Sequence, residues 1–175
     1  MKPTLRLLLL AGSLVTFPAM ALEGERIGSV TATIDGTGYT GETLAFPSEG
    51  SAMATFVPVG PSVTVSVQAM DPQAESRLNN MLVIDFTALG TDATAQMITG
   101  SISWWPEGMD SPFYISDENA GHAGITLDSL SLDGEARVTG SFDTSICRKD
   151  GPFSEADTSK CVKVSGTFDT ALHAQ

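Results

Sequence analysis

The sequence predicts an all-β domain, either an antiparallel β-sandwich or a barrel, with one disulfide and at most one short helix. In several short segments, apolar and polar residues alternate with the two-residue period of a half-buried strand. Clusters of Gly, Pro, Asp and Ser separate these segments, and no long stretch has the period of an amphipathic helix. Many short strands in one domain are typical of both architectures, so the choice between sandwich and barrel stays open.

The chain begins with a predicted signal peptide, residues 1–21. Lys2 and Arg6 accompany an uncharged apolar run over residues 7–17, and Ala19-Met20-Ala21 is suited to cleavage after Ala21. The run is too short to span a bilayer, and no cysteine follows it to carry a lipid anchor. We therefore expect a periplasmic or secreted protein in which residues 22–175 form a single all-β domain.

The composition is that of an acidic globular domain. Hydrophobic residues make up 42% of the chain and charged residues 17%, which provides enough apolar material for a core. Loss of Lys2 and Arg6 with the signal peptide changes the formal charge from −12 to −14. Such a surface repels phosphate backbones and anionic lipids, so we expect no nucleic-acid partner and no membrane insertion of the mature chain.

Four segments show the strand pattern most clearly, and each places its apolar residues on one face. These sets are Val30, Ala32 and Ile34; Val63, Val65, Val67 and Ala69; Leu82, Ile84, Phe86 and Ala88; and Ile98, Ile102 and Trp104. Between the second and third sets, Asp71 can cap a helix and Pro72 suits the first helical position. The sequence therefore predicts a helix of barely two turns that ends before Met81.

The end of the chain predicts two hairpins. Asp133-Gly134 is a two-residue turn signal that joins residues 124–132 to 135–147. The next strand, over 161–172, brings the second of the only two cysteines, Cys147 and Cys161. An even cysteine count in an exported chain predicts a disulfide between them, worth on the order of 3 kcal/mol for a loop of this length.

A disulfide in this hairpin fixes its register. With Cys147 opposite Cys161 in antiparallel strands, even-numbered residues pair with even-numbered ones. One face then holds Val138, Phe142, Ile146, Val162, Val164 and Phe168. Phe142 is expected to lie opposite Gly166, and Phe168 opposite Gly140, an arrangement in which the ring covers the glycine. The alternation of apolar residues and the predicted disulfide therefore indicate the same register.

Two related segments carry a family resemblance. Val164-Ser-Gly-Thr-Phe168, after Thr139-Gly-Ser-Phe142, resembles the end of small exported β-domain proteins of Gram-negative bacteria. The resemblance covers the signal peptide and this closing part of the chain. It implies an exported β fold and no particular activity.

The most unusual stretch runs from Trp104 to Tyr114 and is the candidate binding site. Trp105, with Phe113 and Tyr114, can form an aromatic shelf that stacks on a sugar ring or grips a partner side chain. Trp104 is expected on the opposite side of the strand, beside Ile102. The alternative interpretation, which is favoured, is that these rings cap an open end of the core.

Catalytic and metal sites have little support. The oxygen-rich residues Glu107, Asp110, Asp117, Glu118 and Asn119 lack the spacing of a calcium loop, and solvated acids are the favoured interpretation. The two histidines, His122 and His173, accompany no nucleophile motif and too few soft ligands for zinc. We expect no catalytic residues, no metal and no cofactor.

Four cations surround the predicted disulfide: Arg148, Lys149, Lys160 and Lys163, with Phe153 in the loop between. They can dock an acidic partner, but the nearby carboxylates favour local charge balance.

The sequence thus favours an exported, non-enzymatic binding or interaction module with a protein or glycan partner. The alternatives are a small glycan hydrolase that uses a carboxylate pair and, if the strands close, a carrier of an apolar ligand. The pattern leaves the oligomeric state open.

Overall fold

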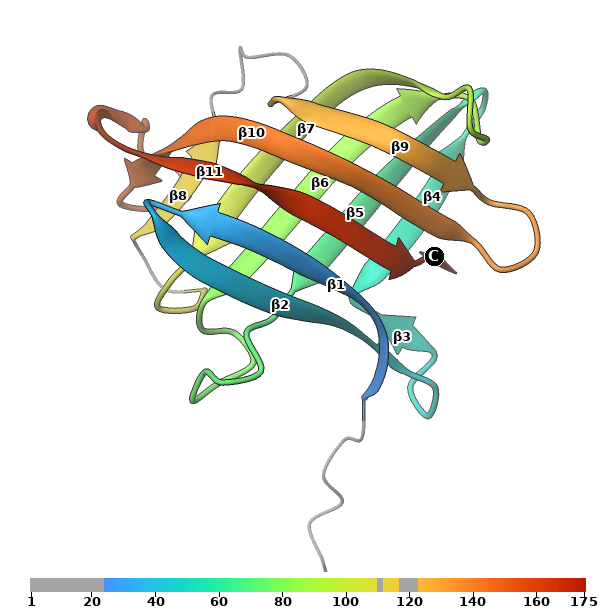
Figure 1. Ribbon diagram of the computed structural model, residues 1–175, viewed down its shortest axis with the longest axis horizontal. Helices are drawn as coiled ribbons and strands as arrows, with labels where there is room; N and C mark the ends of the chain where they lie inside the picture. The colour runs from blue at the N-terminus through green and yellow to red at the C-terminus, as the bar shows by residue number, and fades with distance from the viewer. Residues whose placement is uncertain (1–23, 110–111, 117–122) are drawn as a thin grey trace, which may run out of the picture.

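The computed structural model describes residues 24–109, 112–116 and 123–175. In these residues the chain forms strands and turns and no helix (Figure 1). The strands are β1 (Glu25–Ile34), β2 (Thr37–Phe46), β3 (Ser51–Ala52), β4 (Ala54–Val59), β5 (Ser62–Ala69), β6 (Met81–Leu89), β7 (Gln96–Trp105), β8 (Phe113–Ser116), β9 (Ile125–Ser131), β10 (Arg137–Lys149), β11 (Asp157–Ala171) and β12 (His173–Ala174). The predicted signal peptide, with its cleavage site after Ala21, lies outside the described residues.

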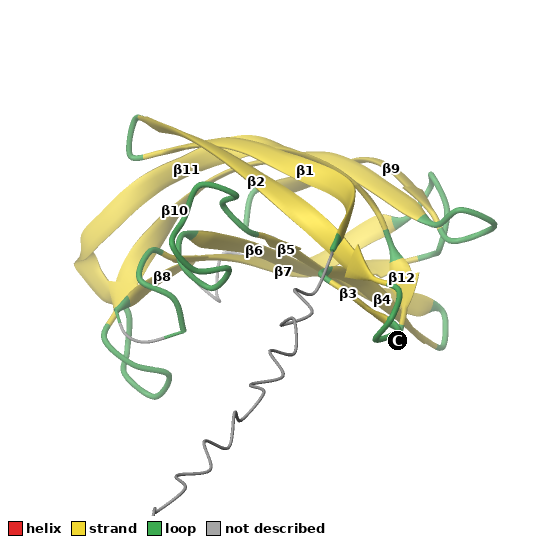
Figure 2. Ribbon diagram, turned by 90° about the horizontal axis from the view of Figure 1, so that it is seen from below, coloured by secondary structure: helices red, strands yellow, loops and turns green. Residues whose placement is uncertain are grey.

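The strands form one sheet in the order β12-β4-β5-β6-β7-β8-β10-β11-β1-β2-β3, and β9 pairs with β10. All pairs are antiparallel except β12 with β4. The sheet does not close, and it folds over into two layers, so the architecture is sandwich-like (Figure 2). One layer holds β1, β2, β9, β10 and β11, the other holds β4, β5, β6 and β7, and β8 pairs with both β7 and β10.

The core lies between the two layers and is built from the alternating apolar residues. The fully buried large side chains are Val30, Val63, Val65, Val67, Leu82, Ile84, Ile102, Ile125, Val138, Ile146, Val164 and Phe168. Inward alternation is therefore confirmed for β1, β5 and β6. No described segment forms a helix long and apolar enough to cross a membrane.

The register of the β10–β11 hairpin is confirmed. Cys147 pairs with Cys161 and forms the disulfide, and the even-numbered apolar residues of both strands face the core. Phe168 lies opposite Gly140. A Cβ atom on Gly140 would come within 2.5 Å of both the Phe168 ring and the Thr126 carbonyl oxygen. Glycine is therefore required where the ring crosses the strand.

The β9–β10 hairpin forms, but the prediction of a two-residue turn at Asp133-Gly134 is wrong. The last pair is Ser131 with Arg137, so residues 132–136 form a longer loop. Gly134 has a φ of 71°, as the turn signal suggests. The reason for the extra length lies at Ala136, which is buried and accepts a hydrogen bond from Leu172 N at 2.8 Å. Docking this residue into the core keeps it out of the ladder.

A β-bulge changes the predicted inner face of β7. Thr87 pairs with Thr99 and Ala88 pairs with Met97, which leaves Ile98 as the extra residue. Ile98 is therefore 52% exposed, and Met97 packs against the core in its place. Alternation beyond Thr99 is regular, so Ile102 and Trp104 keep the predicted face.

Turns replace the predicted helix after Asp71. The Asp71 carboxylate accepts a hydrogen bond from the Gln73 backbone N–H at 2.8 Å, as a helix cap would. Its other oxygen accepts from the Asn80 amide at 2.7 Å. One side chain thus holds both ends of the segment 71–80, which stays a closed loop at the end of the sandwich. Local capping was predicted correctly, but the second contact is with a residue at the far end of the loop.

Candidate functional site

Two aromatic pairs lie on opposite faces of the sheet where β7 meets β8. Trp104 packs on Tyr114 with ring centroids 5.2 Å apart and planes tilted by 34°. Trp105 stacks on Phe113 with centroids 4.1 Å apart and planes 7° apart. Adjacent residues of a strand point to opposite faces, so the structure does not bring Trp105 and Tyr114 into one shelf.

The Trp105–Phe113 pair is packed on the outer face. Phe113 is buried, and the Trp105 indole N–H donates to the Ser103 hydroxyl at 3.0 Å. Met81, the cross-strand neighbour of Trp105, is also buried. The ammonium of Lys149 lies 6.0 Å from the Phe113 ring centroid. These contacts favour a packing role for this pair.

The Trp104–Tyr114 pair lines a pocket of about 350 Å³ at the end of the sandwich. The opposite wall comes from the β1–β2 hairpin, which supplies Asp35, Thr37 and Tyr39. Asn80, the last residue before β6, completes the polar lining. With Val162 on β11, segments from five parts of the chain therefore meet at one aromatic pocket.

A chain of hydrogen bonds fixes the Trp104 ring. Its indole N–H donates to the amide oxygen of Asn80 at 2.8 Å, and the Asn80 amide nitrogen donates to Asp71 at 2.7 Å. The Asn80 backbone N–H donates to the carbonyl of Pro106 at 3.1 Å. Asn80 has a φ of 54°, a conformation that asparagine adopts more readily than most residues. The turn before β6 thereby holds the pocket wall in one orientation.

Tyr39 is fixed in a similar way. Its hydroxyl donates to the carbonyl of Ala69 at 2.7 Å, and burial raises its pKa, so the phenol stays neutral. The ring runs past Gly41, where a Cβ atom would lie 2.6 Å from the Tyr39 hydroxyl oxygen. The glycine gives the ring room to join β2 to the end of β5.

Replacement of Asn80 by glycine tests this hydrogen-bond chain. Glycine accepts the φ of 54°, so Asn80→Gly removes the amide without adding backbone strain. We expect a loss of about 1 kcal/mol in the free energy of unfolding and a shift of the Trp104 indole N–H resonance. The Trp105 indole resonance is the internal control, and equal shifts of both signals would contradict the assignment.

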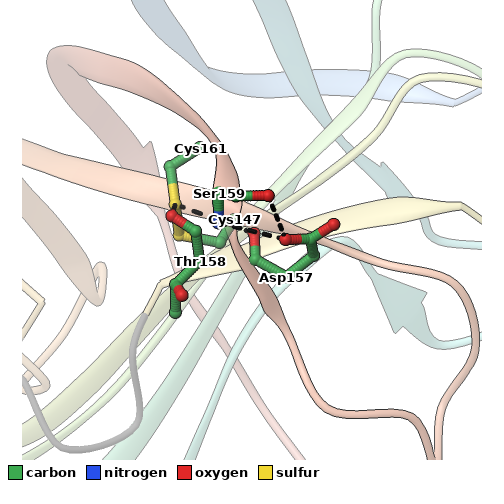
Figure 3. The surroundings of a disulfide bond; sticks show 5 residues. All are labelled: Cys147, Asp157, Thr158, Ser159 and Cys161. Atoms are coloured by element: carbon green, nitrogen blue, oxygen red, sulfur yellow. Dashed lines mark hydrogen bonds between the residues drawn. A yellow bond between two sulfur atoms is a disulfide. The ribbon is translucent and has the colours of Figure 1, made fainter.

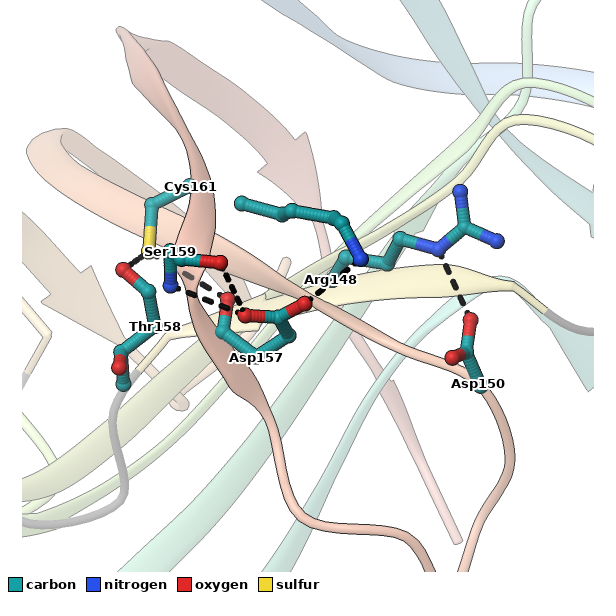
Figure 4. Close-up of polar contacts among 7 residues, drawn as sticks. Arg148, Asp150, Asp157, Thr158, Ser159 and Cys161 are labelled. Atoms are coloured by element: carbon teal, nitrogen blue, oxygen red, sulfur yellow. Dashed lines mark hydrogen bonds and ion pairs between the residues drawn. The ribbon is translucent and has the colours of Figure 1, made fainter.

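Two of the four cations around the disulfide form local ion pairs (Figure 4). Arg148 Nε lies 2.8 Å from Asp150, and Lys160 Nζ lies 2.7 Å from Asp157. Hydrogen bonds from Lys160 and Ser159 lower the pKa of Asp157 to about 2. At these two pairs, the geometry favours local charge balance over docking of an acidic partner.

The disulfide borders a bulge in β11. Cys147 pairs with Cys161, yet Arg148 pairs with Asp157, so residues 158–160 have no partner on β10. Asp157 closes the bulge by accepting from the backbone N–H and the hydroxyl of Ser159 (Figure 3). Phe153, in the adjoining loop, is fully exposed.

The remaining predicted residues lie partly outside the described part of the chain. Glu107 is exposed, and Asp110, Asp117, Glu118, Asn119 and His122 lie outside the described residues. His173 is exposed on β12. In the described parts of the chain, no three His, Cys, Asp or Glu side chains are placed to hold a metal ion.

A shallow groove on the outer face of β5, β6 and β7 contains Asp85. Its volume is about 200 Å³, and its other lining residues include Thr64, Thr87, Thr99 and Ser101. Burial raises the pKa of Asp85, and a hydrogen bond from Ser66 opposes that shift. The carboxylate is therefore less favourable in the folded protein than in the unfolded chain.

We expect Asp85→Asn to stabilise the protein at neutral pH. A raised native pKa means that stability is lost as pH rises through it, because the folded state must then bury the charge. Asparagine keeps an oxygen for Ser66 and removes the charge. Urea unfolding should show a higher free energy of unfolding at pH 7 and little difference at about pH 3. A gain of equal size at both pH values would exclude the charge as its cause.

Comparison with known proteins gives no match to a family model, to a curated protein or to a solved structure.

Sequence reasoning identified Trp104 and Tyr114 but missed the other pocket residues. Tyr39 follows the inward alternation of β2 with Gly41, a signal for burial that says nothing of a pocket. Asp35 and Asn80 share a clearer signal: each is a small polar residue of the type that favours turns, and in the structure each has a positive φ beside a strand. That signal predicts a turn, and only the folded arrangement brings these turns together.

Proposed function

We propose that this protein is an exported, non-enzymatic binding module whose ligand site is the pocket lined by Tyr39, Trp104 and Tyr114. The observation that carries the proposal is the fixed Trp104 ring in an open pocket, held by Asn80 and Asp71. A side chain whose orientation is set in advance loses little conformational freedom when a ligand packs on it.

Three further features support a binding role. A pocket of about 350 Å³ is within the size range of small-ligand sites, and aromatic rings give large contact areas. The site lies at an end of the sandwich, where loops meet over a rigid sheet. Secretion is consistent with the Cys147–Cys161 disulfide, since such bonds persist in oxidising compartments.

The two alternatives gain less support. A carboxylate-pair hydrolase would use Glu107 with residues outside the described part of the chain, and Glu107 itself is exposed. A carrier of an apolar ligand needs interior space, whereas the sheet does not close and large side chains fill the region between its layers.

The chain contains two tryptophans, so two indole N–H resonances report on the pocket and on the opposite face separately. The probes are D-glucose, N-acetyl-D-glucosamine, choline chloride and N-acetylphenylalanine amide, titrated into the ¹⁵N-labelled mature protein. We expect at least one probe to move the Trp104 resonance with saturation while the Trp105 resonance stays in place.

Tyr114→Ala and Trp105→Phe form the matched pair of variants. The first should abolish the response to that probe, and the second should keep it and assign the remaining indole signal. Circular dichroism melting verifies that both variants are folded. If no probe moves the Trp104 resonance, or if Tyr114→Ala binds as well as the parent, the pocket is not the ligand site.

A further inference from the structure

We infer that the pocket takes an organic cation with a methylated ammonium group, such as a trimethylammonium headgroup; this inference rests on the proposed function. It follows from the combination of ring surface, carboxylate and engaged polar groups at one cavity. The ring surface attracts cations, the acidic residue disfavours anions, and the engaged polar groups disfavour sugars.

Three aromatic side chains line the pocket. Tyr39 comes from one layer, and Trp104 and Tyr114 come from the other layer and its connecting strand. The faces of such rings carry partial negative charge and attract cations within about 6 Å of the ring centroid. Because the rings line a single cavity from different sides, one compact cation can contact more than one of them.

Two polar side chains of the wall, those of Asn80 and Tyr39, already have hydrogen-bond partners. The Asn80 amide oxygen accepts from Trp104, and its amide nitrogen donates to Asp71. The Tyr39 hydroxyl donates to Ala69. A sugar ring needs partners for several hydroxyl groups, and buried groups without partners cost binding energy. A quaternary ammonium group has no N–H donors, so it leaves no hydrogen-bond donor without a partner in this environment.

The charges at the pocket favour a cation. Asp35, an exposed residue of the β1–β2 turn, is the acidic residue of the lining, and no Lys or Arg belongs to the lining residues. The carboxylate of Asp71, which accepts a hydrogen bond from Asn80, places a further negative charge near Tyr39 and helps to raise the pKa of that residue. Arg148 is the cross-strand neighbour of Tyr114, and Asp150 engages its guanidinium at 2.8 Å.

The net charge of the mature chain also favours a cationic ligand. The mature chain carries a formal charge of −14 once Lys2 and Arg6 are removed from the precursor charge of −12. A surface of this sign raises the local concentration of cations and lowers that of anions. Phosphorylated or carboxylated ligands are thereby disfavoured at a pocket that already contains Asp35.

The test compares choline with 3,3-dimethylbutan-1-ol, its neutral carbon analogue of nearly equal shape. Both are titrated into the mature protein at low salt while the two indole resonances are followed. We expect choline to bind about three- to thirtyfold more tightly, the range that cation–π attraction provides. Tetramethylammonium chloride should compete with choline, since it retains only the charged group.

Charge variants separate Asp35 from the general acidity of the protein. Asp35→Asn should weaken choline binding severalfold, and asparagine accepts the φ of 49° at this position. Asp133→Asn removes the same charge from the β9–β10 loop, which lies at the other end of the molecule (Figure 1). This control should leave choline binding within about twofold of the parent.

Equal affinities for choline and its neutral analogue would overturn the cation inference and leave the proposed binding role intact. Absence of any response to choline would also overturn it, and the sugar and amide probes would then decide the proposed function separately. Equal weakening by Asp35→Asn and Asp133→Asn would overturn the role of the pocket carboxylate.

Discussion

Phe168→Ala is expected to lower the free energy of unfolding by about 3–5 kcal/mol, the usual cost of truncating a buried phenylalanine. Phe168 is 2% exposed and lies near the C-terminal end of β11, between Val30 on β1 and Gly140 on β10. Its ring fills the space over the glycine, which has no side chain of its own. A domain with a typical stability of about 5–15 kcal/mol would lose a large share of it.

The surrounding structure cannot close over the space that the ring leaves. A Cβ atom on Gly140 would still lie 2.5 Å from the Thr126 carbonyl oxygen after the ring is removed. Gly140→Ala should therefore destabilise the parent protein and fail to rescue Phe168→Ala. The cavity cost remains because both strands are fixed by their neighbours on either side.

Urea unfolding followed by tryptophan fluorescence measures this effect, with Phe153→Ala as the matched control. Phe153 is fully exposed, so its truncation should change the free energy of unfolding by less than about 0.5 kcal/mol. A Phe168→Ala variant within about 1 kcal/mol of the parent would show that the ring contributes little to the core.

The closing hairpin could be predicted because one crosslink and one alternation pattern constrain the same strands. Cys147 and Cys161 set the register, and the inward position of Phe168 then follows from counting residues. Elsewhere the alternation identifies which face is buried but leaves open which strands are neighbours. The pairing of β8 with both β7 and β10, which brings Tyr114 to Trp104, has no counterpart in local sequence.

Two local differences have physical causes that depend on distant residues. Ile98 is displaced by a bulge whose position is defined by the pairing with β6, so alternation within β7 alone cannot locate it. The turns after Asp71 replace a helix because Asp71 also binds Asn80, which in turn holds Trp104. The candidate pocket was therefore only half predictable: its rings on β7 and β8 were identified, and its opposite wall was not.

Loss of the disulfide is the second change with a large expected effect. Replacement of both Cys147 and Cys161 by alanine should lower the free energy of unfolding by about 3 kcal/mol, the value for a crosslink that closes a loop of roughly 15 residues. The two cysteines are 14 residues apart and form the last regular pair before the β11 bulge. Without the bond, the unfolded chain gains conformational entropy, and no covalent link joins the ends of β10 and β11.

Loss of the disulfide should also loosen the pocket, because β10 connects the two. Just beyond Cys147, Arg148 pairs with Tyr114 and Lys149 pairs with Phe113, so the same end of β10 holds β8 in place. We expect the double variant to broaden the Trp104 indole resonance at temperatures where the global fold persists.

Urea unfolding with and without a reductant isolates the bond from the substitutions. The reductant should lower the unfolding midpoint of the parent protein and leave that of the double alanine variant unchanged. If the unfolding midpoint of the parent protein does not change on complete reduction, verified by mass, the disulfide has no stabilising role. A reduced protein that is less stable but keeps a sharp Trp104 resonance would instead show that β8 is held without it, because the pairing of β8 with β7 then suffices.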